Sequence, residues 1–162
     1  NLFLTDEAVN NFDTRFKVMP PLRTEKDNIT LINALNDGTI DVITTDHTPQ
    51  DAENKKIEFD NAAFGIIGLE SAFGLIGKHL LEKIGIATII EKIAINPRKV
   101  LKISEVKIEE GLPANITFFN PDLEWEFTSK DIKSLSINTP FIGEKLKGKA
   151  LAIYNNGQFK IC

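Results

Sequence analysis

Asp46 and His47 are the adjacent residues in this sequence best suited to chemistry. They directly follow Asp41–Thr45, a run rich in β-branched residues that predicts a β-strand, and Pro49 then ends the strand. In parallel α/β sheets, chemistry collects where strands end at the carboxyl edge. A carboxylate there can bind a divalent metal or take a proton from a metal-bound water. The alternative is structural: Asp46 caps a turn and His47 makes a hydrogen bond within the scaffold.

A catalytic zinc ion needs three protein ligands and an open position, which Asp46 and His47 cannot supply by themselves. The only other histidine, His79, lies midway along an apolar helical pattern and is expected to be a packed helix residue. The single cysteine, Cys162, excludes an internal disulfide framework and a cysteine-rich zinc site. The chain alone is therefore expected to lack a complete hydrolytic metal site.

Two further positions are candidates for substrate binding. Arg23 follows Pro-Pro-Leu and could bind a substrate carboxylate through its planar guanidinium, or it could be a surface arginine near a helix start. Phe64 and Gly65 offer a turn where the backbone could approach a ligand closely, because glycine has no Cβ. The alternative for this pair is an ordinary entry into the following helix.

The elements before residue 50 are those of an α/β protein. Residues 15–19 alternate polar and apolar side chains, as a short strand does. Thr24 and Asp27 predict a capped helix start, and Gly38 is the residue expected to end that helix. The strand at 41–45 follows directly. Strand, helix and strand with short links favour a parallel pair of strands.

The next fifty residues are predicted to be mainly helical. Residues 50–60 are charged and predict a loop in which the pair Lys55 and Lys56 is solvated. Apolar periodicity then predicts helices at about 69–83 and 87–95, the second stopped by the Asn-Pro pair that follows it.

The sequence pattern changes after residue 100. Short alternating runs at 115–119 and 150–154 predict β-strands, and Asn156-Gly157 is a strong hairpin signal. We therefore expect two parts, an α/β part over residues 1–100 and a mostly β part over 101–162.

Composition narrows the class of protein. The formal net charge of −4 argues against a nucleic-acid binder, which would carry a basic face. No apolar run reaches the length needed to span a membrane, and the first residues carry acids where a signal peptide carries bases. These features, with the single cysteine, predict a cytoplasmic protein. The start at Asn1, without an initiator Met, is consistent with a piece of a longer chain.

Several motifs, taken together, resemble the C-terminal part of dihydroorotase, an enzyme of the amidohydrolase superfamily. The carriers of the resemblance are PPLR at 20–23, DGTIDVITTDHTP at 37–49, FGIIGLE at 64–70, NP at 96–97, and the stretches 111–117 and 136–143, in the same order as in the family. The resemblance covers roughly residues 13–157.

The resemblance implies an α/β fold, a metal-dependent (β/α)8 barrel with a small β-sandwich built from both chain ends. This chain would supply the C-terminal strands and helices of the barrel and the C-terminal part of the sandwich. The implied reaction is the zinc-dependent, reversible cyclisation of carbamoyl-aspartate to dihydroorotate in pyrimidine biosynthesis. Asp46 would contact zinc and move the proton, whereas the substrate would be bound by Arg23, His47, Gln50, Phe64 and Gly65. The histidine ligands would lie upstream of Asn1, so the chain alone is expected to be inactive and without zinc.

The sequence departs from the family pattern near the substrate. Met19 stands where the family usually has Asn, Gln50 where it has a second His, and Asn115 where it has Asp. Two hypotheses follow: a fragment of an active dihydroorotase, or a non-catalytic dihydroorotase-like partner of, for example, aspartate transcarbamoylase. With only two barrel strands, apolar faces would lie bare, so we expect rearranged helices or a homo-oligomer.

Overall fold

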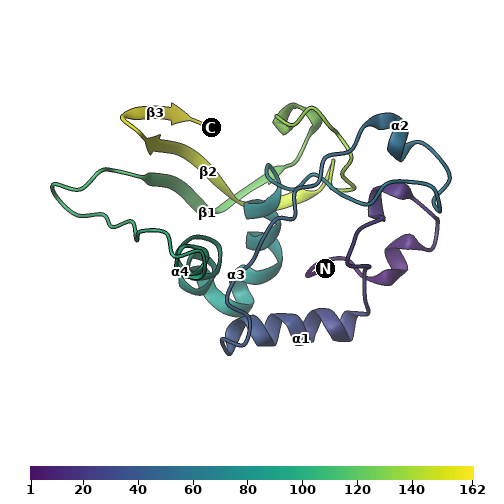
Figure 1. Cartoon of the computed structure of the whole chain (residues 1–162), viewed down its shortest axis with the longest axis horizontal. Coiled ribbons are helices and arrows are strands. Elements are labelled where there is room, and N and C mark those ends of the chain that lie inside the picture. The colour runs from purple at the N-terminus through teal and green to yellow at the C-terminus, as the bar shows by residue number, and fades with distance from the viewer.

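A computed structural model describes all of residues 1–162 and shows an α/β chain, with helices in the first hundred residues and one sheet near the end (Figure 1). The α-helices are α1 (Glu25–Asn36), α2 (Ala52–Lys55), α3 (Ala72–Ile90) and α4 (Asn96–Val100). The strands are β1 (Ile116–Glu126), β2 (Lys145–Asn155) and β3 (Gln158–Ile161). Short 3-10 turns are η1 (Asp6–Val9), η2 (Thr14–Phe16) and η4 (Ser129–Asp131), and η3 (Glu91–Ile95) is a π-helical turn.

Helix α1 begins and ends where the sequence predicts. The Asp27 backbone N–H donates to Thr24 Oγ1 and the Thr24 N–H donates to Asp27 Oδ2, which forms a capping box. Gly38, just beyond the C-cap, has φ +85°, a conformation that glycine adopts without steric cost. Ile32 and Leu35 on the buried side of α1 pack in a cluster with residues of α3.

Helix α3 is the central element, and it runs between the sheet and α1 (Figure 1). Gly85, with φ +76° and ψ 158°, is not helical and divides α3 into two helical pieces. The prediction of two helices, at about 69–83 and 87–95, is therefore confirmed, and the second piece continues into η3. The Asn96-Pro97 pair begins α4 instead of stopping a helix, because a proline in the first turn needs no N–H partner.

The three strands form one antiparallel sheet in the order β1-β2-β3. Asn156 and Gly157 link β2 to β3 with φ values of +49° and +73°, as a tight hairpin of this type requires, so the hairpin prediction is confirmed. β2 lies against α3: Gly77 is so close to the strand that an added Cβ would overlap the Lys147 carbonyl oxygen.

The strands expected at 15–19 and 41–45 do not form, so the predicted parallel pair is wrong for this chain. The reason is that neither segment has a continuous backbone partner: the Ile43 N–H donates to the Lys92 carbonyl (3.1 Å) and not to another strand. The Gly65 N–H donates to the Lys17 carbonyl (3.0 Å), and the Thr48 N–H donates to the Ile66 carbonyl (2.9 Å). Only an isolated parallel bridge, His47 with Ile66, remains. A strand needs continuous backbone partners, and these segments have only scattered ones.

The expectation that Lys55 is solvated is also wrong, although Lys56 is exposed. Lys55 is buried, and its ammonium group donates to the carbonyls of Ala63 (2.8 Å) and Gly65 (3.1 Å). Burial lowers the pKa of this ammonium, and the neighbouring Lys17 lowers it further. The loop at 50–60 also contains the short helix α2.

Only some of the apolar side chains are buried. Two clusters form the core: six residues shared by α1 and α3, and three residues around Phe127. Many large apolar side chains remain exposed, among them Leu135, Ile108 and Ile161. No helix combines the length and the apolar character needed to cross a membrane.

Candidate functional site

An apolar cavity of about 630 Å³ lies between the helices and the segments that precede them. Its walls are residues 18–20, Ile40, 42–46 and 66–68, the first residues of the chain, and the facing sides of α1 and α3. Of its 25 lining residues, 19 are hydrophobic. Among its lining residues is Asp46, a predicted site residue, so this cavity is the place to look for a ligand.

Asp46 is the one charged side chain that lines this cavity. It is exposed, and its φ of +45° lies in the left-handed region that non-glycine residues enter at a cost of about 1 kcal/mol. The Asp46 carbonyl accepts a hydrogen bond from Thr48 Oγ1 at 3.0 Å, which closes the turn. This turn follows residues 41–45 directly, so the carboxylate stands at the end of that segment.

His47 has a structural contact on one ring nitrogen. Its Nδ1 accepts hydrogen bonds from the backbone N–H groups of Gly68 (3.0 Å) and Leu69 (3.2 Å). A nitrogen that accepts in this way carries no proton, so the neutral ring holds its hydrogen on Nε2. His47 does not line the cavity. These two contacts agree with the structural alternative for His47, a hydrogen bond within the scaffold.

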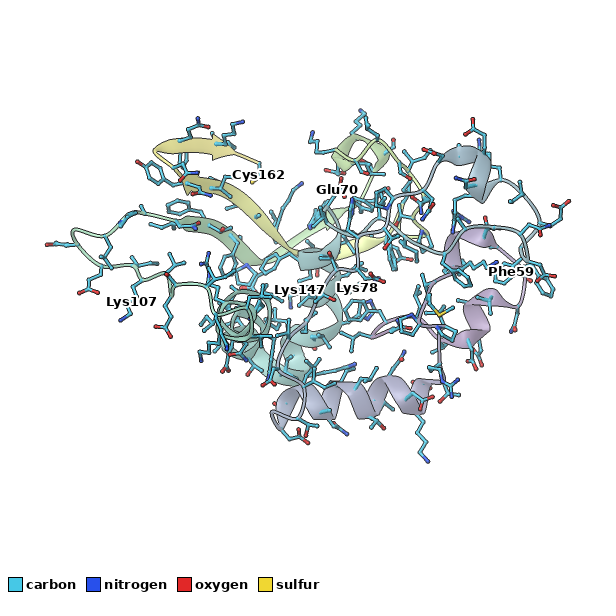
Figure 2. All side chains as sticks on the ribbon, viewed as in Figure 1. Phe59, Glu70, Lys78, Lys107, Lys147 and Cys162 are labelled. Atoms are coloured by element: carbon cyan, nitrogen blue, oxygen red, sulfur yellow. The ribbon has the colours of Figure 1, made fainter.

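Glu70 was missed by reasoning from the sequence. Its Oε1 accepts from the backbone N–H groups of Lys133 (3.0 Å) and Ser134 (2.7 Å), and its Oε2 is buried without a partner. Burial acts to raise the pKa of this carboxyl, but the backbone N–H groups and the nearby His47 outweigh it, so the pKa is lowered. Figure 2 labels Glu70, which joins the turn before α3 to the loop after η4. The only sequence signal was an acid just before a helix.

Gln50 is held by the scaffold at both its side chain and its backbone. Its Nε2 donates to the Phe64 carbonyl at 2.9 Å, and its backbone N–H donates to Asn138 Oδ1 at 3.3 Å. Asn138 is buried and also donates through Nδ2 to the Gly65 carbonyl at 2.9 Å. Asn138 therefore joins two segments next to the cavity to the loop before β2. It too was missed, because its partners are far away in the sequence.

Phe64 and Gly65 pack against protein groups. The Phe64 ring is 44% exposed, and the Lys17 ammonium lies 4.7 Å from its centroid, a cation–π contact. Gly65 has φ +135°, and a Cβ at this position would lie 2.6 Å from the Thr48 carbonyl oxygen. The glycine is needed for the close approach of two backbone segments, whether or not a ligand is bound.

Arg23 lies outside the cavity. Its side chain is 70% exposed, and its Nε is 4.0 Å from Asp27 Oδ2, one turn along at the start of α1. Such an exposed pair contributes little to stability. Of the predicted site residues, only Asp46 faces the cavity. None of the others lines it.

No three side chains of the His, Cys, Asp or Glu type lie close enough together to hold a metal ion. The donor set around Asp46 consists of that carboxylate alone, because His47 uses Nδ1 for backbone contacts. A catalytic zinc site needs three protein ligands. The residues of this chain therefore do not fit a complete metal centre.

The chain was compared with known proteins. No family model matches it. It is 46% identical over 162 residues to the dihydroorotase of Thermoanaerobacter sp. (strain X514), covering 99% of this chain and 37% of that protein. It is 44% identical over 146 residues to the dihydroorotase of Chlorobaculum tepidum, covering 88% of this chain and 33% of that protein. The chain thus spans about a third of the length of these relatives.

Solved structures with a similar fold are hydantoinases. The L-hydantoinase (dihydropyrimidinase) from Arthrobacter aurescens superposes with a TM-score of 0.88 at 22% identity, over 99% of this chain and 38% of that one. A D-hydantoinase gives a TM-score of 0.84 at 22% identity, over 99% of this chain and 37% of that one. At this identity the similarity concerns the fold alone, and it extends over the whole chain.

Proposed function

We propose that this chain forms the later part of a hydrolase that acts on cyclic amides. The proposal starts from its similarity to dihydroorotases, which extends along 99% of this chain. The observation that carries the proposal is the position of Asp46, the one charged side chain on the wall of an apolar cavity. A carboxylate in such surroundings is suited to accept a proton from an attacking water and to return it to the leaving nitrogen.

The proposal assigns residues 1–100 to a (β/α)8 barrel and residues 101–162 to a small β-sandwich. The open apolar cavity supports the first assignment, since the strands of a complete barrel would supply the apolar partners that its walls lack. The antiparallel sheet β1-β2-β3 supports the second. In a complete barrel, residues 15–19 and 41–45 would gain the strand neighbours that are absent here.

The chemistry assigned to this chain is limited to what its own residues can do. In this proposal Asp46 holds and moves a proton, and His47 fixes the turn at 66–69 beside it. Substrate contacts in the complete protein are assigned to Arg23, Gln50, Phe64 and Gly65, none of which lines the cavity of this chain. Zinc would require ligands from outside these 162 residues, so no step is assigned to it here. The substrate is a small molecule, and the names of the relatives support a role in pyrimidine biosynthesis. A cytoplasmic homo-oligomer is the proposed state.

The test is an Asp46→Asn variant of the native protein that carries this chain. Ring opening of cyclic amides is followed by the loss of substrate absorbance. Removing the proton acceptor should lower kcat by a factor of about 10² to 10⁴. The control is Asp41→Asn, at the exposed far end of the same segment, which should keep the activity of the unaltered protein. Equal activity of the two variants would rule out the role given to Asp46.

A non-catalytic, dihydroorotase-like partner protein is the second candidate. The specific observation in its favour is Gln50, whose amide donates to the Phe64 carbonyl and is committed to the scaffold. Aspartate transcarbamoylase is the partner proposed for that case. Background activity on every cyclic amide, together with stable co-elution of aspartate transcarbamoylase, would support this candidate over the first.

A further inference from the structure

We infer that Asn138, in the loop between η4 and β2, is a positioning residue for the reaction assigned to Asp46. It fixes the turn that carries Asp46 relative to the segment 64–67. The inference rests on the proposed function and names a residue that sets the geometry of that site. It comes from hydrogen bonds among three segments that lie far apart in the sequence.

Two of these segments, residues 46–50 and 64–67, lie directly against each other. The Thr48 N–H donates to the Ile66 carbonyl at 2.9 Å. A Cβ added to the glycine of the second segment would lie 2.6 Å from the Thr48 carbonyl oxygen. Because the two backbones are in close contact, a shift of one against the other changes the surroundings of Asp46.

Asn138 is bonded to both segments at once. Its Oδ1 accepts from the Gln50 backbone N–H at 3.3 Å, and its Nδ2 donates to the Gly65 carbonyl at 2.9 Å. Its own backbone carbonyl accepts from the Ile67 N–H at 3.1 Å. The residue is buried, so these contacts are shielded from water.

The carboxamide group suits this task. It carries an acceptor and a donor on one planar group, so a single side chain can bond an N–H of one segment and a carbonyl of another. The Gly65 carbonyl also accepts from the Lys55 ammonium at 3.1 Å, so two donors fix its direction. A hydrocarbon side chain at position 138 would remove the bonds to both segments.

Ser136 completes the connection from the same loop. Its Oγ donates to the Gln50 carbonyl at 2.7 Å, accepts from the Asn138 N–H at 3.3 Å, and contacts Asn138 Oδ1. The loop therefore bonds both backbone groups of Gln50, the N–H through Asn138 and the carbonyl through Ser136. Thr139, the next residue, is 1% exposed, which anchors the loop in the interior.

The consequence concerns proton transfer at Asp46, which lies four residues before Gln50. A proton acceptor must lie within hydrogen-bond distance of the proton that it takes, and a displacement of about 1 Å can lower the rate about 10²-fold. Asn138 does not line the cavity and takes no proton. It acts through the backbone of Gln50 and Gly65, which is the definition of a positioning residue.

The experiment uses the native protein that carries this chain, with dihydroorotate as the substrate. For Asn138→Ala we expect kcat to fall at least tenfold and KM to change by a smaller factor, because Asp46 acts in the chemical step. The matched control is Asn28→Ala. Asn28 is also buried and donates through Nδ2 to a distant carbonyl, that of Leu4, at 2.9 Å, but has no bond to either segment beside Asp46. It should lower the unfolding temperature to a similar extent and keep kcat.

Ser136→Ala is the milder second variant, because it removes one hydroxyl group of a partly exposed residue. It should lower kcat roughly threefold. Ser136→Thr keeps the hydroxyl group and should restore kcat. Thermal unfolding identifies the folded variants, and all rates are measured well below their unfolding temperatures. If Asn138→Ala does not fold, the Ser136 pair decides the outcome.

The outcomes separate the two proposals. A folded Asn138→Ala variant with the kcat of Asn28→Ala would overturn the positioning role and leave the hydrolase proposal standing. A rise in KM alone would also overturn it, since Asp46 would then still be in place. Where only the Ser136 variants fold, equal kcat for Ser136→Ala and the unaltered protein would have the same effect. No turnover by the unaltered protein would overturn both proposals.

Discussion

At the scale of single residues, the polar groups near the cavity have separate tasks. Asp46 faces the cavity, whereas His47 and Glu70 bind backbone N–H groups and thereby hold the turn at 66–70 in place. Asn138 joins this turn to the chain near Gln50. Buried polar groups of this kind are worth more as a connected set than singly, because each loss leaves another group without a partner.

Glu70→Gln should lower the free energy of unfolding by about 2 kcal/mol at pH 7, the usual range for hydrogen bonds to a charged acceptor. The folded-state pKa of Glu70 is lowered, so its contribution is fully present above the unfolded pKa and is lost as the pH falls through the folded pKa. Urea unfolding at pH 7 and at acidic pH measures both effects. The control is Glu82→Gln, whose side chain is 87% exposed. An effect no larger than that of the control would contradict the role of Glu70.

We expect His79 to make the free energy of unfolding fall at mildly acidic pH. Its ring stacks on Phe3 with centroids 4.7 Å apart, and burial, with Lys78 and Lys83, lowers its pKa while Glu144 raises it. The unfolded chain therefore binds more protons between the folded pKa and about 6.5, so stability falls as the pH drops through that window. His79→Phe keeps the stack and should remove this fall, measured by urea unfolding at pH 7.5 and 5.5. The same fall in the variant would assign the pH dependence to another group.

At the scale of elements, the contact between α3 and β2 organises the chain. Figure 2 shows Lys78 and Lys147 along this contact, where Lys78 Nζ lies 2.7 Å from Glu144 Oε2 and Lys147 Nζ lies 3.5 Å from Glu82 Oε1. These pairs are partly exposed and contribute little. The close approach of the helix to the strand depends instead on Gly74 and Gly77, which have no side chains to hold the two elements apart.

Gly77→Ala should destabilise the fold by about 1 to 3 kcal/mol, the usual cost of overpacking. Its Cβ would lie only 1.9 Å from the Lys147 carbonyl oxygen, so the helix or the strand must move. Gly85→Ala is the comparison, because its φ of +76° costs strain but no atom lies within 4 Å of the added Cβ. Thermal unfolding and the sheet signal in circular dichroism compare the two. Loss of sheet signal is expected only for Gly77→Ala, and an intact sheet would show that the contact is dispensable.

At the scale of the whole molecule, the chain exposes more apolar surface than an isolated domain usually does. Only 25 of 162 residues are buried, and the cavity beside Asp46 is open and mostly apolar. The sheet adds Phe118, Phe159 and Ile161, all exposed. Contiguous apolar surface of this kind is typical of a face that packs against further protein.

The isolated 162-residue chain is therefore expected to self-associate. Sedimentation velocity over a range of concentrations should show species larger than the monomer, growing with concentration, and a dye that binds apolar surface should fluoresce. Covering the cavity with the remainder of a longer chain should abolish both signals. A monomer at every concentration, without dye binding, would show that the chain buries these surfaces by itself.

The sequence by itself determined the features that depend on near neighbours. The capping box of α1, the Gly38 terminus and the Asn156-Gly157 hairpin all formed as predicted, because each needs contacts only a few residues apart. The β character of the last fifty residues followed from their alternation in the same way. The types of residues 41–49 also predicted that Asp46 lies at the end of the segment 41–45.

Only the tertiary structure decided the features that depend on distant partners. Glu70 binds N–H groups 63 and 64 residues away, and Gln50 binds Asn138 across 88 residues, so no local pattern could reveal either contact. Lys55 is buried because two carbonyls from 63–65 turn towards it. Residues 15–19 and 41–45 have the composition of strands but not the neighbours, and a strand exists only where another backbone pairs with it.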